Sequence, residues 1–296
     1  MFMLTLILTA LHSVQSDYYS TSASKESYPF IVSISKLKFG VMKSHICVGS
    51  IIRSNQVLTG CGCTGEFRQN RLRPHDPKWY KVLTGMIEND GNAEEEHDVT
   101  EMLPHKRCRK INALFNQYDI AVIVVQQPFS VEITSSTFTL GSLFTDKQVL
   151  AMMRSGSACT AVAWGRTGPE NSLFVGERVR VVDVRLMKYA RCQETVCDIE
   201  EDVCTEESTM VYAGIVCGRS NYSCVIDKGS PVFCENKLFA IASEVLCPYG
   251  LPVSPFIYMR IDKIFDWLQP LLNEAHPATQ TLYLLTILLF LTAIMF

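Results

Sequence analysis

The sequence predicts an all-β fold followed by one α-helix near the C-terminus. Short segments rich in valine, isoleucine and aromatic residues recur along the chain, and many are separated by glycine, proline, asparagine or aspartate. Helical periodicity is clear only near the end, where Ile264, Phe265 and Leu268 fall on one face after Asp262, a residue type that caps helix N-termini. Pro270 is expected to kink this helix.

The predicted strands are, in chain order, residues 30–37, 50–59, 119–126, 158–165, 178–186, 237–245 and 256–261. Some of them alternate apolar and polar residues and others are continuously apolar, which is typical of barrel and sandwich strands. With 296 residues, of which 48% are hydrophobic, the chain is long enough to bury the core of one large domain or two small ones.

Both ends of the chain differ from its middle. Residues 1–16 form an apolar run that ends in small and polar residues, which predicts a secretory signal peptide cleaved near Ser16. Residues 281–296 form an uncharged apolar run shorter than the roughly 20 residues of a bilayer-spanning helix. Small residues and a polar spacer precede this run, so residues 273–296 are predicted to be a signal for GPI attachment at Asn273. A single membrane-spanning tail is the alternative.

The cysteine count and the net charge limit the kinds of ligand that the protein is expected to bind. Twelve cysteines in a chain with a predicted signal peptide indicate disulfides rather than metal ligands, and we expect neither a metal nor a cofactor. The formal net charge is −3 and no block rich in lysine and arginine occurs, so the sequence gives no support for nucleic-acid binding. The expected location is the extracellular face of the plasma membrane, and the expected partner is another extracellular protein.

Four motifs in the middle of the chain occur in a characteristic order. They are "HICVGSIIRSNQVLTGCGC" at 45–63, "YDIAVIVV" at 118–125, "CTAVAWGRTG" at 159–168 and "CVIDKGSPVFC" at 224–234. Together they resemble the trypsin/chymotrypsin-like serine proteases over nearly all of residues 28–272. The resemblance implies two packed six-stranded antiparallel β-barrels, at about 28–142 and 143–262, and a C-terminal helix at about 262–272. Residues 17–27 then form a short N-terminal arm without an activation motif.

The catalytic positions of that family carry altered residues in this sequence. By resemblance, the catalytic histidine falls on Gly62, the aspartate on Asp119 and the nucleophilic serine on Lys228. Glycine cannot accept a proton, and an ammonium group that is protonated at neutral pH is not a nucleophile. The glycine of the oxyanion hole falls on Ile226, whose β-branched side chain disfavours the backbone angles that glycine allows. The resemblance therefore implies a catalytically inactive homologue that acts by binding, as a decoy, a protease cofactor or a recognition surface.

A second interpretation is an active hydrolase with a rearranged nucleophile. Ser230 lies two residues after Lys228, and Cys61 adjoins the position of the missing histidine. Ser230 falls where the family has a glycine, which favours the role of a turn hydroxyl. A reactive thiolate needs a base or a positive neighbour, and the sequence places none beside Cys61. We expect a disulfide between Cys61 and Cys108 instead.

The substrate pocket is also altered by comparison with the family. The residue at its base falls on Tyr222, and the substrate-binding strand reads Ser243, Glu244 and Val245, with valine where glycine is usual. Asn221 begins the sequon Asn-Tyr-Ser, so a glycan is predicted beside the former cleft. These changes oppose protease-like binding of an extended peptide.

Residues 17–27 do not contain the Ile-Val-Gly-Gly motif at which family members are cleaved during activation. In the family a new amino terminus pairs with the aspartate that precedes the serine, which here is Asp227. An unpaired buried carboxylate is costly, and His45 matches a histidine that serves as its partner in family zymogens. We expect Asp227 and His45 to form a zymogen-like pair.

The cysteines match part of the family's disulfide frame. By analogy, the expected pairs are Cys47 with Cys63, Cys159 with Cys234, and Cys224 with Cys247. A fourth family pair is not matched, because Tyr212 stands where a cysteine is usual. Four cysteines are left without an assigned partner: Cys192, Cys197, Cys204 and Cys217.

Overall fold

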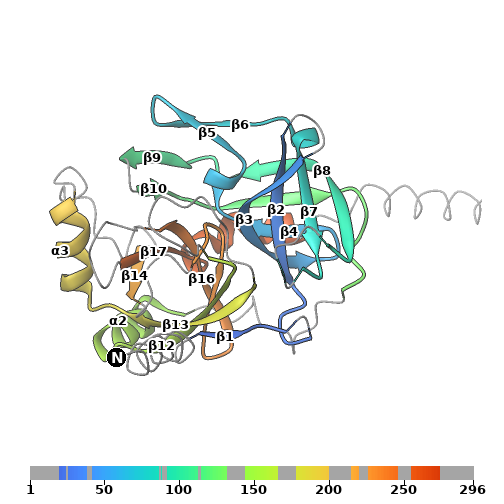
Figure 1. Ribbon diagram of the computed structural model, residues 1–296. Coiled ribbons are helices and arrows are strands. Elements are labelled where there is room, and N and C mark those ends of the chain that lie inside the picture. The colour runs from blue at the N-terminus through green and yellow to red at the C-terminus, as the bar shows by residue number, and fades with distance from the viewer. Residues whose placement is uncertain are drawn as a thin grey trace, which may run out of the picture. The chain divides into compact units, whose positions relative to one another are not determined.

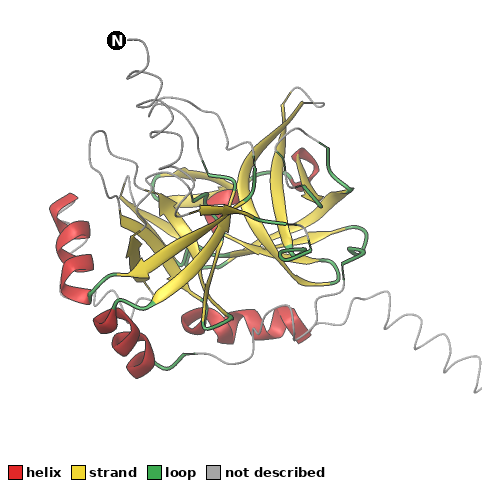
Figure 2. Cartoon of the chain, turned by 60° about the horizontal axis from the view of Figure 1, so that its bottom comes forward, coloured by secondary structure: helices red, strands yellow, loops and turns green. Residues whose placement is uncertain are grey.

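Two closed antiparallel β-barrels make up most of the chain that the structure describes (Figure 1). The computed structural model describes residues 20–24, 26–38, 42–86, 88, 92–112, 115–131, 144–165, 178–199, 215–219, 226–245 and 255–273. Figure 2 shows that strands dominate these residues. The predicted all-β fold of two six-stranded barrels with a C-terminal helix is confirmed. The predicted signal peptide at 1–16 and the apolar tail lie outside the described residues.

The first barrel contains β2 (Ile31–Lys38), β3 (Met42–Arg53), β4 (Gln56–Thr59), β7 (Tyr80–Thr84), β8 (Glu95–Pro104) and β11 (Ala121–Val125). The strand order is β11-β4-β3-β2-β7-β8, and β8 closes the barrel by pairing with β11. All five residues of β11 are buried, which explains its continuously apolar sequence.

The second barrel contains β12 (Ala158–Ala163), β13 (Arg180–Leu186), β14 (Ile215–Arg219), β15 (Pro231–Cys234), β16 (Lys237–Val245) and β17 (Pro255–Arg260). The strand order is β13-β12-β15-β16-β17-β14, and β13 closes the barrel by pairing with β14. From Val182 onward, β13 alternates buried and exposed residues, as expected for a strand with one face on the core.

The N-terminal arm contributes one more strand to the second barrel. The short strand β1 (Ser20–Ser22) pairs antiparallel with Arg180–Val182 of β13. Strand β13 therefore has three neighbours, because it also pairs with β12 and β14. Residues 17–27 were expected to form a short N-terminal arm without an activation motif, and the pairing of this arm was not predicted.

A separate four-stranded sheet accompanies the first barrel. It consists of β5 (Gly65–Arg68), β6 (Arg71–Pro74), β9 (Arg109–Asn112) and β10 (Phe115–Gln117), in the order β10-β9-β6-β5. Figure 1 shows the β5–β6 hairpin and the β9–β10 hairpin extending away from the barrel strands. This sheet matters for the site because β5 directly follows the short 3₁₀ helix η1 (Cys61–Cys63).

Two further α-helices lie beside the second barrel (Figures 1 and 2), and the expectation of a single helix was wrong. They are α2 (Asp146–Ser155) and α3 (Tyr189–Ile199). Thr145 and Gln148 form a capping box at the start of α2, and Gly156 ends it in a left-handed conformation.

Helix α2 was missed because its apolar pattern is short. Its buried positions are confined to Val149, Met152 and Met153, which cover little more than one turn. The predicted C-terminal helix begins with the 3₁₀ turn η4 (Asp262–Ile264) and continues as α4 (Phe265–Asn273), with Pro270 inside it. Within the described part of the chain, the helices fall short of the length and apolarity needed to cross a membrane.

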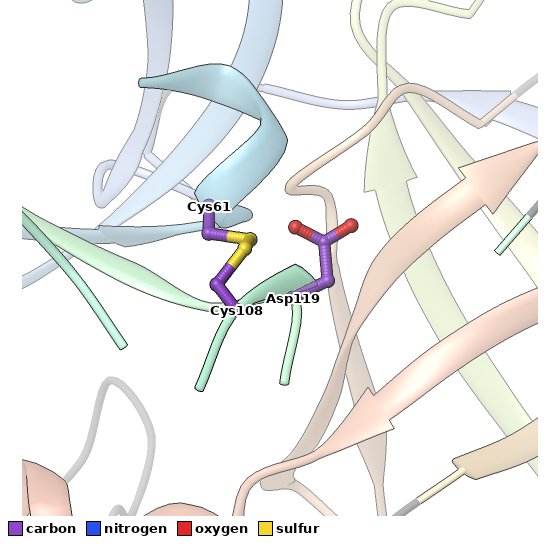
Figure 3. A group of neighbouring side chains, drawn as sticks. All are labelled: Cys61, Cys108 and Asp119. Carbon is purple, nitrogen blue, oxygen red and sulfur yellow. A yellow bond between two sulfur atoms is a disulfide. The ribbon is translucent and has the colours of Figure 1, made fainter. Parts of the chain in front are cut away.

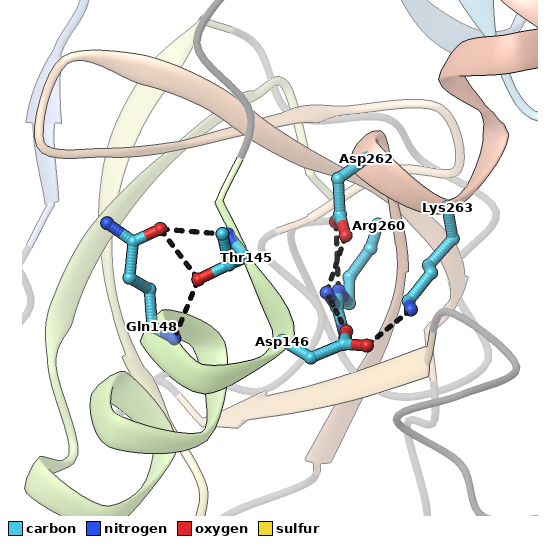
Figure 4. A network of polar contacts seen from close by, with 6 residues as sticks. All are labelled: Thr145, Asp146, Gln148, Arg260, Asp262 and Lys263. Atoms are coloured by element: carbon cyan, nitrogen blue, oxygen red, sulfur yellow. Dashed lines mark hydrogen bonds and ion pairs between the residues drawn. The ribbon is translucent and has the colours of Figure 1, made fainter.

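A buried arginine links the start of α2 to the end of β17 (Figure 4). Arg260 is fully buried, and its guanidinium donates hydrogen bonds to both carboxylate oxygens of Asp262, at 2.9 and 2.6 Å, and to Oδ1 of Asp146 at 2.8 Å. Lys263 donates to Oδ2 of Asp146 at 2.7 Å. The two carboxylates offset the cost of burying the arginine charge, and they join segments more than 100 residues apart.

Candidate functional site

Asp119 lies at the centre of the candidate site. It immediately precedes β11 and is 1% exposed. Its Oδ1 accepts a hydrogen bond from the backbone N–H of Gly62 at 2.9 Å, and its Oδ2 accepts from Nδ2 of Asn116 at 3.0 Å and from Oγ of Ser243 at 2.6 Å. Because Ser243 belongs to β16, the carboxylate joins the two barrels. Three donors satisfy this buried group without an imidazole.

Asn116 lies beside the space that a side chain at position 62 would enter. A Cβ placed on Gly62 would lie 3.4 Å from Nδ2 of Asn116 and 3.7 Å from Oδ1 of Asp119, both ordinary contacts. A longer side chain directed at the carboxylate would meet the Asn116 amide. Sequence reasoning missed Asn116, and the available signal was a polar residue three positions before Asp119.

Lys228 lies in a tight loop between two buried neighbours. Ile226 is 2% exposed and packs in the core of the second barrel. The carbonyl oxygen of Lys228 accepts a hydrogen bond from the backbone N–H of Val48, in β3, at 2.9 Å. The loop is therefore attached to both barrels, and the side chain of Lys228 is half-buried.

Gly229 makes the closest approach of this loop to the first barrel. Its φ is +80°, and an added Cβ would lie 2.1 Å from the carbonyl oxygen of Val48 and 2.3 Å from Oγ1 of Thr59. The backbone N–H of Gly229 donates to the carbonyl of Ala242 at 2.7 Å. Only glycine combines this left-handed conformation with so little space.

Asp227 and His45 lie together, as the sequence led us to expect. Nε2 of His45 is 3.8 Å from Oδ2 of Asp227, and the two side chains are 4% and 9% exposed. Oδ2 of Asp227 also accepts the backbone N–H of Gly165 at 2.7 Å. On the other side of the ring, Nδ1 of His45 is hydrogen-bonded to the hydroxyl of the buried Ser33 at 2.8 Å.

The surroundings of His45 favour its neutral form. Burial lowers the pKa of the imidazole, and the Asp227 carboxylate opposes this shift. The ring also lies 5.2 Å from that of Trp164. Ser33 was not identified from the sequence, although the alternation of serine with isoleucine in "VSIS" indicated that some serines face inward.

Neither proposed replacement nucleophile is placed to react. Ser230 is fully buried, and its hydroxyl has no hydrogen-bond partner among the described residues. Cys61 is fully buried and bonded to Cys108. Figure 3 shows this disulfide beside the Asp119 carboxylate, and the ligand-type atoms of the three residues lie within 4.8 Å of one another. A disulfide has no thiolate to offer a metal ion or a substrate.

The comparisons with known proteins identify the family of this chain. The family model named Trypsin matches residues 19–268. The chain belongs to the trypsin family. Tonin from Rattus norvegicus is 31% identical over 119 residues, which is 40% of this chain and 43% of tonin, so the match spans less than half of that relative's length.

Two solved structures share the trypsin-family fold. One is neuropsin, a serine protease expressed in the limbic system of mouse brain, with 19% identity, a TM-score of 0.61, and coverage of 86% of this chain and 99% of neuropsin. The other is the scabies mite inactivated protease paralogue S-D1, with 17% identity, a TM-score of 0.63, and coverage of 86% and 96%. At these identities the likeness concerns the fold alone.

Among the described residues, the structure forms four disulfides: Cys47–Cys63, Cys61–Cys108, Cys159–Cys234 and Cys192–Cys217. The first and third are pairs that the resemblance to the trypsin family implied, and the second is the bond expected in place of a reactive thiol. The fourth assigns partners to two cysteines whose pairing the sequence left open.

Several predicted positions fall outside the described residues. They include the pocket position Tyr222, the sequon Asn221, and the expected pair Cys224 and Cys247, together with Cys204. Asn273, the predicted attachment residue, is the last residue of α4, and Val245 is the last residue of β16.

Proposed function

We propose that this chain is a catalytically inactive member of the trypsin family that acts by binding another extracellular protein. The observation that carries the proposal is the set of donors to Asp119: the Gly62 backbone, the Asn116 amide and the Ser243 hydroxyl. None of these groups accepts a proton from a nucleophile at neutral pH. Acyl transfer needs a base within hydrogen-bond reach of its nucleophile.

The loop at 226–230 supports the same proposal. It carries Lys228 where the resemblance places a nucleophilic serine, and the neighbouring Ser230 is buried. In triad chemistry the base and the nucleophile act as a unit worth about a millionfold in turnover. If the base and the nucleophile are both absent, the retained Asp119 carboxylate no longer contributes to catalysis.

The chain of contacts from Ser33 through His45 to Asp227 supports a permanently zymogen-like state. In this arrangement His45 lies beside Asp227, which the resemblance makes the partner of a new amino terminus. A fold without activity has a precedent in the scabies mite neighbour, whose description calls it an inactivated protease paralogue.

In this fold, few strand edges are free to pair with the backbone of a binding partner. Both barrels are closed, and closure removes free edges. Among the described strands, the edges that remain are those of β1, β5 and β10. We therefore propose that a partner docks mainly on side chains, whereas a protease substrate pairs its backbone with a strand edge. The protein would act as a decoy, a protease cofactor or a recognition surface.

The decisive experiment is activity-based labelling of the folded ectodomain. A fluorophosphonate probe and a thiol-reactive probe should leave it unlabelled, and a peptide library should show no turnover, while an active trypsin-family protease tested in parallel is labelled. Multiple turnovers by the wild-type protein that are abolished by Lys228→Ala or Ser230→Ala would refute the proposal.

We also propose display on the outer cell surface through a GPI anchor, which rests on the composition of residues 273–296. A phosphatidylinositol-specific phospholipase should release the protein from intact cells. Retention on the cells after treatment, with a known GPI-anchored protein released in parallel, would favour a membrane-spanning tail.

A further inference from the structure

The four-stranded sheet of β5, β6, β9 and β10 has two unlike faces. On one face, Phe67 and Leu72 lie opposite each other and pack against the Cys61–Cys108 disulfide. On the other face, Glu66 lies opposite Arg73 and Arg68 lies opposite Arg71, and all four side chains are exposed. Residues directly opposite in an antiparallel pair share a face. The inner face is therefore anchored, and the outer face is free to contact a ligand.

The strand register collects arginines into one row across this outer face. Arg68 lies opposite Arg71, Arg71 lies opposite Arg109, and Arg109 lies opposite Gln117. All three arginines are exposed. Neighbouring strands are about 4.8 Å apart, and like charges directly opposite each other destabilise a sheet. Arg71, between two other guanidinium groups, is the least favourable member of the row.

The protein supplies little countercharge to this row. Arg68 forms an ion pair with Glu66 at 2.7 Å, and Arg109 bonds the neutral side chain of Gln117 at 2.8 Å. Within the described part of the chain, Arg71 and Arg73 form no ion pair. The four strands contain five basic residues and one acidic residue, a net charge of +4 in a chain whose net charge is −3.

Two more exposed cations lie close in sequence to Arg109. Lys106 and Arg107 come shortly before β9, and Nη1 of Arg107 donates to the hydroxyl of Tyr118 at 3.3 Å. We call the set formed by Arg68, Arg71, Arg73, Lys106, Arg107 and Arg109 the arginine face. Because arginine predominates, the face suits oxyanions, such as sulfate groups, whose oxygens accept two parallel hydrogen bonds from one guanidinium.

We infer that the arginine face binds a sulfated polysaccharide. Its cations form a solvent-exposed row without an apolar anchor, since the large hydrophobic side chain exposed among the described residues is Trp79, which lies in η2 (Pro77–Trp79) rather than in the sheet. Protein partners usually insert aromatic or aliphatic anchors into a docking surface, and single-stranded nucleic acids stack on aromatic residues. A sulfated polysaccharide needs neither, because it presents repeated sulfate groups along a flexible chain.

This inference goes beyond the proposed function and does not depend on it. The arginine face lies on a sheet outside both barrels, and none of its arginines donates to Asp119. An active enzyme would carry the same face. Failure of the labelling experiment and failure of the experiment below are therefore distinguishable.

Immobilised heparin and the folded ectodomain provide the test. We expect wild-type protein to bind heparin in a salt-dependent manner and not to bind fully desulfated heparin. Arg71→Glu combined with Arg109→Glu should weaken heparin binding by at least about tenfold, because each charge-assisted pair contributes on the order of one factor of ten. The matched control is Arg53→Glu combined with Arg154→Glu, which changes net charge equally at exposed positions elsewhere and should weaken binding by less than about twofold.

Thermal unfolding of both double variants establishes that they fold, and Arg71→Gln combined with Arg109→Gln replaces the first variant if it does not. The inference is overturned if heparin does not bind, or if the two double variants lose binding equally. It is also overturned if polyglutamate or single-stranded DNA binds as tightly as heparin. Salt-sensitive self-association in place of heparin binding, measured by sedimentation, would identify a second copy of the chain as the occupant and would likewise overturn it.

Discussion

The side-chain amide of Asn116 donates a hydrogen bond to Oδ2 of Asp119 at 3.0 Å, while the backbone N–H of Gly62 donates to Oδ1 at 2.9 Å. An amide can hold a buried carboxylate in place, but it cannot relay a proton. The site therefore holds the buried Asp119 carboxylate with an amide, a group that has no acid–base chemistry at neutral pH.

Replacement of Asn116 by alanine is expected to lower the free energy of unfolding by about 1–3 kcal/mol, because one donor to a buried carboxylate is lost. Chemical denaturation measures the change. The control is Gln126→Ala, which removes an exposed amide and should change stability by less than about 0.5 kcal/mol. Equal stability of the two variants would show that the Asn116–Asp119 bond contributes nothing.

Gly229→Ala is expected to destabilise the fold by at least about 3 kcal/mol or to prevent folding, because it adds a steric clash to an unfavourable left-handed conformation. Gly156→Ala provides a matched comparison. Gly156 has φ +65°, but the nearest atom to an added Cβ is 3.7 Å away. Its replacement should cost only about 1–2 kcal/mol, measured by thermal unfolding. Similar losses for both variants would exclude the clash as the main cause.

Stability should fall as pH decreases below neutrality, in part through His105. Burial, together with Arg107 and Lys106, lowers the pKa of His105 from 6.5 to about 4. The unfolded chain therefore binds a proton between these two pH values that the folded protein does not, so acid favours unfolding in that window.

His105→Gln should make the free energy of unfolding less dependent on pH between 6.5 and 4. Glutamine keeps an acceptor for the backbone N–H of Arg107, which Nδ1 of His105 accepts at 3.2 Å. Urea denaturation at a series of pH values gives the slope. A slope unchanged from that of the wild type would rule out His105 as the titrating group.

The arginine row predicts an unusual response to neutralisation. Arg71→Gln should raise the free energy of unfolding by about 0.2–1 kcal/mol at low salt, because it removes a cation that faces two others. The gain should disappear at high salt. Arg73→Gln is the control, since Arg73 faces Glu66 and its loss should be neutral or destabilising. A loss of stability in Arg71→Gln larger than that in Arg73→Gln would contradict the repulsion.

Sequence reasoning was most successful where strand pattern and motif order coincide. All seven predicted strand segments contain or overlap strands of the structure, because valine, isoleucine and aromatic residues suit a buried pleated surface in any context. The pair of His45 and Asp227 was also anticipated, because the resemblance to the trypsin family implies a histidine partner for this aspartate. Helices α2 and α3 were not predicted, because each helix is short and its packing against the barrel outweighs its weak pattern.

By itself, the sequence determined the all-β class and the order of the four motifs that carry the resemblance to the trypsin family. Tertiary structure alone decided that Asn116 donates to Asp119, that Ser33 holds His45, and that Arg109 lies in one row with Arg68 and Arg71. The physical reason is that residue type and local hydrophobic pattern can be read directly from neighbouring residues in the sequence. Strand register and barrel closure, which bring distant side chains within hydrogen-bond distance, depend on the packing of the whole domain.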